Sequence, residues 1–230
     1  MKDDMARIPL TQVVDCLQAH YGQLKVPRLA GPWEMILWEN VAYLADDERR
    51  RETFQILKKR IGTAPGRILL APDEALLEVT SHGIVAEQFA KKLRKCAQIA
   101  LEEFDGDLRP VLKLPIAKAK KALQRFPGIG EPGAEKILLL CQTQPVLALE
   151  SNGLRVLLRL GFGEEKKSYS TTYRIVQKAV EEGLATDYSW LIQAHLLLRL
   201  HGQELCKRTK PECKKCPLAV DCEFYQTEGA

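Results

Sequence analysis

Four cysteines near the C-terminal end of the sequence have a spacing that suits a metal centre. They are Cys206, Cys213, Cys216 and Cys222, in the pattern C-x6-C-x2-C-x5-C. Zinc sites usually take their cysteines as two close pairs, and only Cys213 and Cys216 form such a pair here. An iron–sulfur cube accepts uneven spacing, because each of its four irons binds its own thiolate. We therefore predict a [4Fe-4S] cluster on these cysteines, with zinc as the alternative.

Disulfide bonds are a third use of the same cysteines. The chain begins Met-Lys-Asp-Asp-Met, without the apolar stretch of a secretion signal. We expect a protein of this kind to stay in the reducing cytoplasm, where disulfides are rare. The compartment therefore argues against two disulfides.

A second chemical feature is the glycine-rich turn in the segment LQRFPGIGEPGAEKILLL, residues 123–140. We expect one helix to end at Phe126 and the next to begin near Pro132, a residue that suits the first turn of a helix. Gly128 and Gly130 can adopt backbone conformations closed to other residues, so the turn can present N–H groups beside a helix N-terminus. Such groups bind a DNA phosphate without reading the bases. The sequence predicts a helix-hairpin-helix over about residues 117–142; a turn that serves packing alone is the alternative.

Basic residues gather around both features. Residues 113–136 contain six basic residues against two acidic ones, a local balance of +4, and residues 206–222 contain five against two, a balance of +3. The whole chain of 230 residues carries only +4. Two basic surfaces beside a phosphate-binding turn fit a nucleic-acid duplex better than a small metabolite.

Helical periodicity runs through almost the whole sequence. Apolar residues recur at spacings of three and four, and period-two alternation is nearly absent. We therefore predict an all-α fold, with Asp73 as an N-cap and residues 67–70 as part of a connection between helices. The expected helices are 9–19, 33–44, 48–60, 73–79, 85–104, 116–125, 132–142, 151–160, 170–182 and 187–200. No apolar run approaches the roughly 20 residues that span a bilayer, which excludes a membrane location.

Three parts of the sequence together carry a family resemblance. The hairpin FPGIGEPGA, the segment LALESNGLRVLLRLG of residues 147–161 and the cysteine pattern resemble, in order and separation, the endonuclease III and adenine DNA glycosylase branch of the helix-hairpin-helix base-excision superfamily. The resemblance implies two helical lobes with DNA between them. Residues 31–144 would form a six-helix barrel with the hairpin. Residues 1–30 and 145–230 would form a lobe that carries the [4Fe-4S] cluster in a loop over residues 206–222.

The resemblance also implies catalytic positions, and here the chain departs from the family pattern. Members that cleave the strand have a lysine two residues after the last hairpin glycine, whose amine attacks the sugar C1′. This chain has Pro132 there. The family's catalytic aspartate corresponds to Glu150, whose carboxylate would stabilise positive charge on the sugar or activate water. A carboxylate that only caps the helix beginning at Ser151 is the alternative.

A second carboxylate comes from the segment PWEMILWENVAYLADD, residues 32–47. It resembles the opening helix of the adenine and mismatch glycosylases, whose glutamate protonates the departing base. That residue is Glu39 here, in an otherwise apolar helix where burial favours the protonated form. We expect Tyr43 or Leu44 to act as an apolar wedge in the base stack; ordinary core residues are the alternative.

The sequence therefore predicts a DNA glycosylase of base-excision repair, a monomer in the cytoplasm and at the nucleoid. It would hydrolyse the N-glycosidic bond of a damaged or mismatched base in double-stranded DNA, without lyase activity. One alternative is a protein of the same fold that binds distorted DNA without catalysis, and another is a lyase with a relocated lysine. The expected DNA contacts are Gly128, Ile129, Gly130, Lys120, Lys121, Lys136, Lys207, Arg208, Lys210, Lys214 and Lys215.

Overall fold

The computed structural model describes residues 7–26, 29–42, 47–181, 184 and 186–227. These residues form helices and connecting segments without a strand, which confirms the predicted all-α class. The chain divides into two compact units. We call Pro27–Gln144 the hairpin unit. We call the other, which joins Met1–Val26 to Pro145–Ala230, the cysteine unit.

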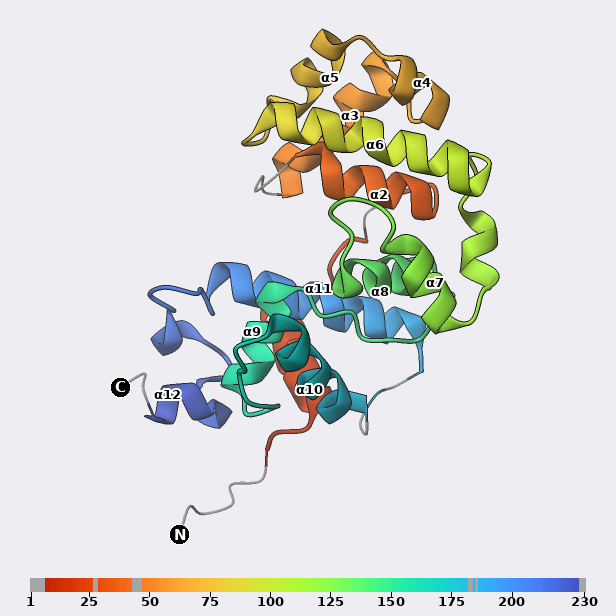
Figure 1. The fold of residues 1–230 in the computed structure, drawn as a ribbon. Coiled ribbons are helices and arrows are strands. Elements are labelled where there is room, and N and C mark those ends of the chain that lie inside the picture. The colour runs from red at the N-terminus through yellow and green to blue at the C-terminus, as the bar shows by residue number, and fades with distance from the viewer. Residues whose placement is uncertain (1–6, 27–28, 43–46, 182–183, 185, 228–230) are drawn as a thin grey trace. The chain divides into compact units, whose positions relative to one another are not determined.

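The hairpin unit is built around its longest helix, α6 (Ala86–Phe104), which packs against α2, α4 and α5 (Figure 1). The other elements of this unit are α2 (Pro32–Val41), α3 (Asp47–Arg60), α4 (Pro65–Leu70), α5 (Asp73–Thr80), the 3-10 helix η1 (Arg109–Lys113), α7 (Ile116–Leu123) and α8 (Glu131–Leu140). The glycine-rich turn lies between α7 and α8, as the helix-hairpin-helix prediction requires.

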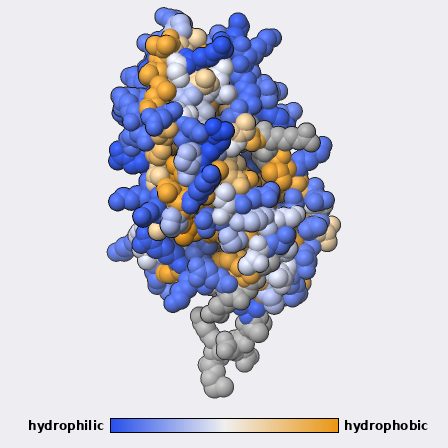
Figure 2. Space-filling view, turned by 90° about the vertical axis from the view of Figure 1, so that its right-hand side faces the viewer, coloured by the Kyte–Doolittle hydropathy of each residue, from blue (hydrophilic) through white to orange (hydrophobic). Residues whose placement is uncertain are grey.

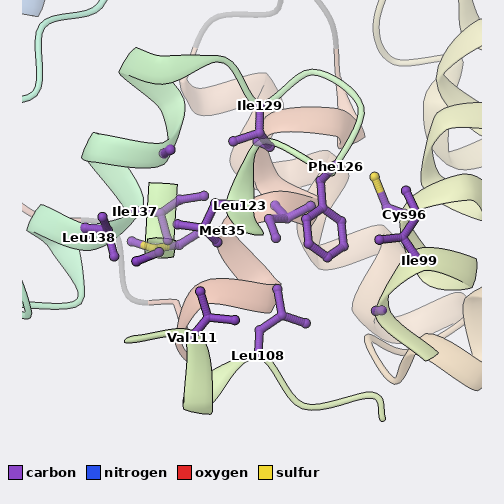
Figure 3. Packing of buried hydrophobic residues seen from close by; sticks show 14 residues of the cluster. Met35, Cys96, Ile99, Leu108, Val111, Leu123, Phe126, Ile129, Ile137 and Leu138 are labelled. Carbon is purple, nitrogen blue, oxygen red and sulfur yellow. The ribbon is translucent and has the colours of Figure 1, made fainter. Parts of the chain in front are cut away.

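Apolar residues anchor this turn in the core of the hairpin unit (Figure 3). Phe126 is 2% exposed and Ile129 is 5% exposed, and both belong to a cluster that includes Met35 of α2. The ring of Phe126 stacks on Phe104 at the end of α6, with ring centroids 5.5 Å apart. Residues on both sides of Gly128 are therefore fixed by packing.

Three local predictions were wrong. Residues 67–70 belong to a helix, α4, because Pro65 suits the first helical turn and Ile68 is fully buried. Asp73 is the first residue of α5 rather than its N-cap, and its carboxylate instead lies 2.5 Å from the guanidinium of Arg94. The helix before the hairpin ends at Leu123, not at Phe126.

The cysteine unit joins both ends of the chain. Helix α1 (Leu10–Tyr21) packs against α11 (Tyr188–Glu204), which also packs along α9 (Ser151–Arg159). Polar contacts tie the ends together: Tyr21 Oη lies 3.0 Å from His201 Nδ1, and Cys16 Sγ donates to Pro217 O at 3.4 Å. The other elements are α10 (Tyr169–Glu181), η2 (Cys213–Lys215), η3 (Ala219–Asp221) and α12 (Glu223–Thr227).

Hydrophilic side chains cover much of the face shown in Figure 2, with hydrophobic patches between them. Within the described ranges, none of the helices is long and apolar enough to cross a membrane.

Candidate functional site

The hairpin presents a small exposed turn at the start of α8. Gly128 has a φ of +81°, which favours glycine, and both Gly128 and Gly130 are exposed. The N–H of Ile129 donates to Phe126 O at 3.1 Å, and the N–H of Ala134 donates to Gly130 O at 2.9 Å. The N–H and the side chain of Ile129 are therefore both used for contacts within the hairpin unit. The accessible backbone beside the N-terminus of α8 is that of Gly128 and Gly130.

Acidic residues neutralise part of the basic surface around this turn. The ammonium of Lys120 lies 2.7 Å from a carboxylate oxygen of Glu131 and 2.5 Å from one of Glu135. The side chain of Glu135 is only 5% exposed, so Lys120 of α7 pairs with a buried carboxylate of α8. Lys121 is exposed on the last turn of α7. Lys121 is therefore more exposed to solvent than the neighbouring Lys120.

An ion pair joins the candidate acid Glu39 to Lys136. Lys136 Nζ lies 2.6 Å from Glu39 Oε1, across 97 residues of sequence, and the two side chains are 19% and 20% exposed. Glu39 comes from α2 and Lys136 from α8. The fold therefore brings together two residues that the sequence offered separately, one as an acid and one as a DNA contact. Glu39 Oε1 is engaged in this contact, so a role for Glu39 at a departing base would require the pair to rearrange.

Glu150 caps α9 in the cysteine unit. One carboxylate oxygen accepts from the N–H groups of Asn152 and Gly153 at 2.9 and 3.2 Å, and the other accepts from Asn152 Nδ2 at 3.0 Å. These bonds use the helix N-terminus to fix the orientation of a partly exposed carboxylate. The capping that the sequence allowed is present in the structure.

The same cap is connected by hydrogen bonds to the first of the four cysteines. Asn152 Oδ1 accepts from Arg155 at 2.8 Å, and Arg155 donates to the carbonyl oxygens of Gly202 and Cys206 at 2.7 and 2.9 Å. One turn further along α9, Arg159 donates to Cys206 Sγ at 3.2 Å and to Lys207 O at 2.9 Å. Sequence reasoning missed both arginines. Their spacing of four, which places them on one face of α9, was the available signal.

The four cysteines lie close enough to influence one another. Burial, together with smaller contributions from the charges of Cys206, Cys222 and Cys213, raises the pKa of the Cys216 thiol to about 11. The ring of His201 also approaches this thiol, with Nε2 3.4 Å from Cys216 Sγ, and burial lowers the pKa of that ring to about 4. Among the described residues, no three His, Cys, Asp or Glu side chains are arranged to hold a single metal ion.

Basic side chains of the cysteine segment fall into two groups. Lys207 and Lys215 each lie 2.8 Å from Glu212, and their hydrogen bonds lower the pKa of that carboxyl to about 2. Arg208, Lys210 and Lys214 are exposed.

Two of the predicted site residues, Tyr43 and Leu44, lie outside the described residues. Pro132, at the position of the family's lysine, is partly exposed in the first turn of α8.

Comparisons with known proteins point to one group. No model of a known protein family matches the chain. An endonuclease III of Rickettsia prowazekii is 34% identical over 105 residues, which are 46% of this chain and 46% of that protein. The alignment thus spans about half the length of that relative. A thymine-DNA glycosylase of Aeropyrum pernix is 26% identical over 220 residues, or 90% of each chain.

The fold agrees with these relatives. A solved structure of endonuclease III, trapped in a covalent intermediate with DNA, has a TM-score of 0.75 to this chain at 19% identity, covering 95% of this chain and 98% of that one. A likeness at this identity shows the fold, and the sequence relatives point to the same group. In sequence the chain is similar to endonuclease III and thymine-DNA glycosylase, and its fold is that of endonuclease III.

Proposed function

We propose that this protein is a DNA glycosylase that removes a damaged or mismatched base from double-stranded DNA by hydrolysis. The observation that carries the proposal is the exposed turn at Gly128 and Gly130, held by core residues at the N-terminus of α8 in a chain with the endonuclease III fold. Such a turn can hold a DNA phosphate without reading sequence. The protein would act as a monomer in the cytoplasm, on DNA of the nucleoid.

Hydrolysis needs a group that stabilises the sugar and a proton for the departing base. Glu150 suits the first role, because its cap fixes the carboxylate, and a carboxylate with about four acceptor positions keeps capacity beyond the three bonds described. Water adds to C1′ as the bond from C1′ to the base nitrogen breaks. Glu39, or Lys136 beside it, would give the base its proton. Pro132 carries no amine, which supports hydrolysis without strand cleavage.

The Lys136–Glu39 pair favours a second candidate, a glycosylase with lyase activity. A lysine next to a carboxylate can pass a proton to it, and the resulting neutral amine can attack C1′ and displace the base. Lys136 has such a partner in the candidate acid Glu39 itself, whose Oε1 lies 2.6 Å from Lys136 Nζ. In this candidate Lys136 replaces the lysine missing at Pro132.

We also propose that Cys206, Cys213, Cys216 and Cys222 bind a [4Fe-4S] cluster. Four thiolates around one zinc ion at about 2.3 Å would lie only about 3.8 Å from one another, whereas a cube gives each thiolate its own corner. The four thiols lie near enough to one another to affect the pKa of Cys216, and their uneven spacing in the sequence suits the cube better. The cluster would hold the loop that carries Arg208, Lys210 and Lys214.

The activity is tested with duplexes that each carry one lesion or mismatch. Base release followed by hot alkali cleaves the strand, and we expect cleavage by the wild-type protein. Glu150→Gln and Glu39→Gln should each lower the rate by at least about a hundredfold, as expected for misplaced or missing catalytic groups. Retention of full activity by both variants would contradict the assigned roles. Tight binding to the same duplexes without any base release would identify a DNA-binding protein instead.

Borohydride trapping separates the two enzymatic candidates. A lyase forms a Schiff base that borohydride reduces to a covalent adduct with DNA. We expect no adduct from a hydrolytic enzyme. If an adduct forms with wild type and disappears in Lys136→Met but not in Lys118→Met, Lys136 is the nucleophile. Lys118 is a suitable control because it is an exposed lysine of α7.

The cluster has its own test, independent of activity. Protein purified without air should be yellow-brown, with broad absorption near about 400 nm and about four irons per chain. Cys222→Ser should lose this absorption. A colourless wild-type protein with one zinc ion would contradict the cluster.

A further inference from the structure

Asn40 makes a contact between α2 and the hairpin that packing alone does not explain. The side chain is fully buried, and Nδ2 donates to Pro127 O at 3.0 Å, across 87 residues of sequence, as well as to Ile36 O at 3.0 Å. Its other polar atom, Oδ1, is buried without a hydrogen-bond partner among the described residues. A buried acceptor without a donor destabilises the folded state. A leucine would fill the same space without that cost, so the amide calls for another explanation.

The absence of a side chain at Gly128 leaves room for the amide of Asn40. A Cβ at Gly128 would lie 2.9 Å from Asn40 Oδ1, closer than real Cβ atoms approach an oxygen, and the φ of +81° already disfavours other residues. In glycine a hydrogen occupies that direction, so Oδ1 faces a Cα–H group, which is a weak donor. Asn40 therefore contacts both residues at the tip of the turn, the carbonyl of Pro127 and the Cα of Gly128.

The direction of one peptide group follows from these contacts. The described chain contains no cis peptide bond, so the C=O of Pro127 and the N–H of Gly128 point in opposite directions across their shared peptide plane. Because Asn40 holds the C=O toward the buried side, the N–H of Gly128 points toward the exposed side. Gly128 itself is exposed, and α8 begins three residues later.

We propose that Asn40 is a positioning residue that aims the N–H of Gly128 at a phosphate of the DNA backbone. This inference rests on the proposed function, since it needs a DNA ligand. Asn40 does not touch the phosphate; it fixes the peptide group that does. The neighbouring residue on α2 is Glu39, so the same helix holds both the hairpin and the candidate acid.

The test measures the dissociation constant of an undamaged duplex by fluorescence anisotropy at one fixed salt concentration, with the protein concentration corrected for the folded fraction. The slope of log K against log salt reports the Lys and Arg charges placed at phosphates, and a neutral N–H does not contribute to it. We therefore expect Asn40→Leu to weaken binding to every duplex alike by about tenfold, as for one lost hydrogen bond to a charged group, and to leave the slope unchanged. Thr80→Val is the matched control: it removes another buried side-chain donor of the same unit, which bonds Leu76 O and Ala86 O, and it should leave the dissociation constant unchanged.

The folded fraction of each variant, measured by circular dichroism on the same samples, separates positioning from stability. An unchanged dissociation constant in Asn40→Leu, with wild type binding DNA, would overturn the role of Asn40 alone. Wild type that does not bind duplex DNA would overturn the proposed function as well.

A second measurement covers the case in which Asn40→Leu fails to fold. The amide of Gly128 is followed by NMR in 15N-labelled wild type while a short duplex is added, and we expect one of the larger shifts of the hairpin unit there. Asn40→Asp, which keeps the shape of the side chain but loses the donor, should show a smaller shift. A Gly128 amide that does not respond to DNA in wild type would refute the inference.

Discussion

The ion pair between Lys136 and Glu39 predicts a measurable loss of stability when the lysine is replaced. The two charged atoms are 2.6 Å apart, and about four fifths of each side chain is buried. With an effective dielectric constant of about 20, unit charges at this distance attract by roughly 6 kcal/mol, most of which the desolvation of both groups offsets. Lys136→Met leaves the largely buried Glu39 carboxylate without this cation. We expect the free energy of unfolding to fall by about 1–3 kcal/mol.

A double-mutant cycle in urea measures the pair itself. Lys136→Met and Glu39→Gln each remove the same ion pair, so the double variant should lose about 1–2 kcal/mol less than the sum of the two single losses. Melting temperatures should fall by roughly 2–4 °C per kcal/mol in a chain of this size. Lys118→Met, in an exposed lysine, should change stability by less than about 0.5 kcal/mol. Losses that add to within about 0.5 kcal/mol would show that the two charges do not interact in solution, and both roles built on the pair would fall with it.

Three further predictions concern other parts of the molecule. A Cβ at Gly202 would lie 2.7 Å from Asn152 O, so Gly202→Ala should lower the free energy of unfolding in urea by about 1–3 kcal/mol. Gly66 has open space around it, so Gly66→Ala should be tolerated. Equal effects of the two substitutions would contradict the close approach of α9 and α11. Hydrogen bonding by Arg125 lowers the pKa of Glu103 below 4.5. That stabilisation is present above pH 4.5 and disappears as the pH falls through the lowered pKa, so the melting temperature of Arg125→Met should lie below wild type at pH 7 and converge with it in acid; a constant difference would refute this. Arg159 donates to Cys206 Sγ, so Arg159→Met should lose its absorption near about 400 nm faster than wild type in air, and an unchanged rate would speak against support of the cluster by this arginine.

Much of the fold could be predicted because the signals were local. The turn at Pro127–Gly130 is punctuated by residues with restricted or unusual backbone preferences, and the helices around it have clear periodicity. Helix α4 was missed because the four residues 67–70 are too short a stretch for periodicity to show. Its start at Pro65 depends on the proline's fixed φ rather than on an apolar pattern.

The site was less predictable, because its contacts join distant parts of the sequence. Glu39 and Lys136 were both candidates, but nothing in a single sequence indicates that residues 97 positions apart form an ion pair. Asn40 gave no signal at all, since a buried amide and a solvent-facing one look alike in sequence. Charge counting also overestimated the basic surface: Glu131 and Glu135 were included in the local balance, but their pairing with Lys120 could not be foreseen.

The cysteine unit is assembled from both ends of the chain, and this has a consequence for synthesis on the ribosome. Helix α1 emerges first, yet its partner α11 begins 167 residues after α1 ends. At about 5–20 residues per second, α1 waits roughly 10–30 s for that partner. The hairpin unit lies between them and can fold during this interval. Translation order therefore favours completion of the hairpin unit before the cysteine segment exists. The apolar face of α1 must remain in solution, or be protected by a chaperone, until the last 40 or so residues are made.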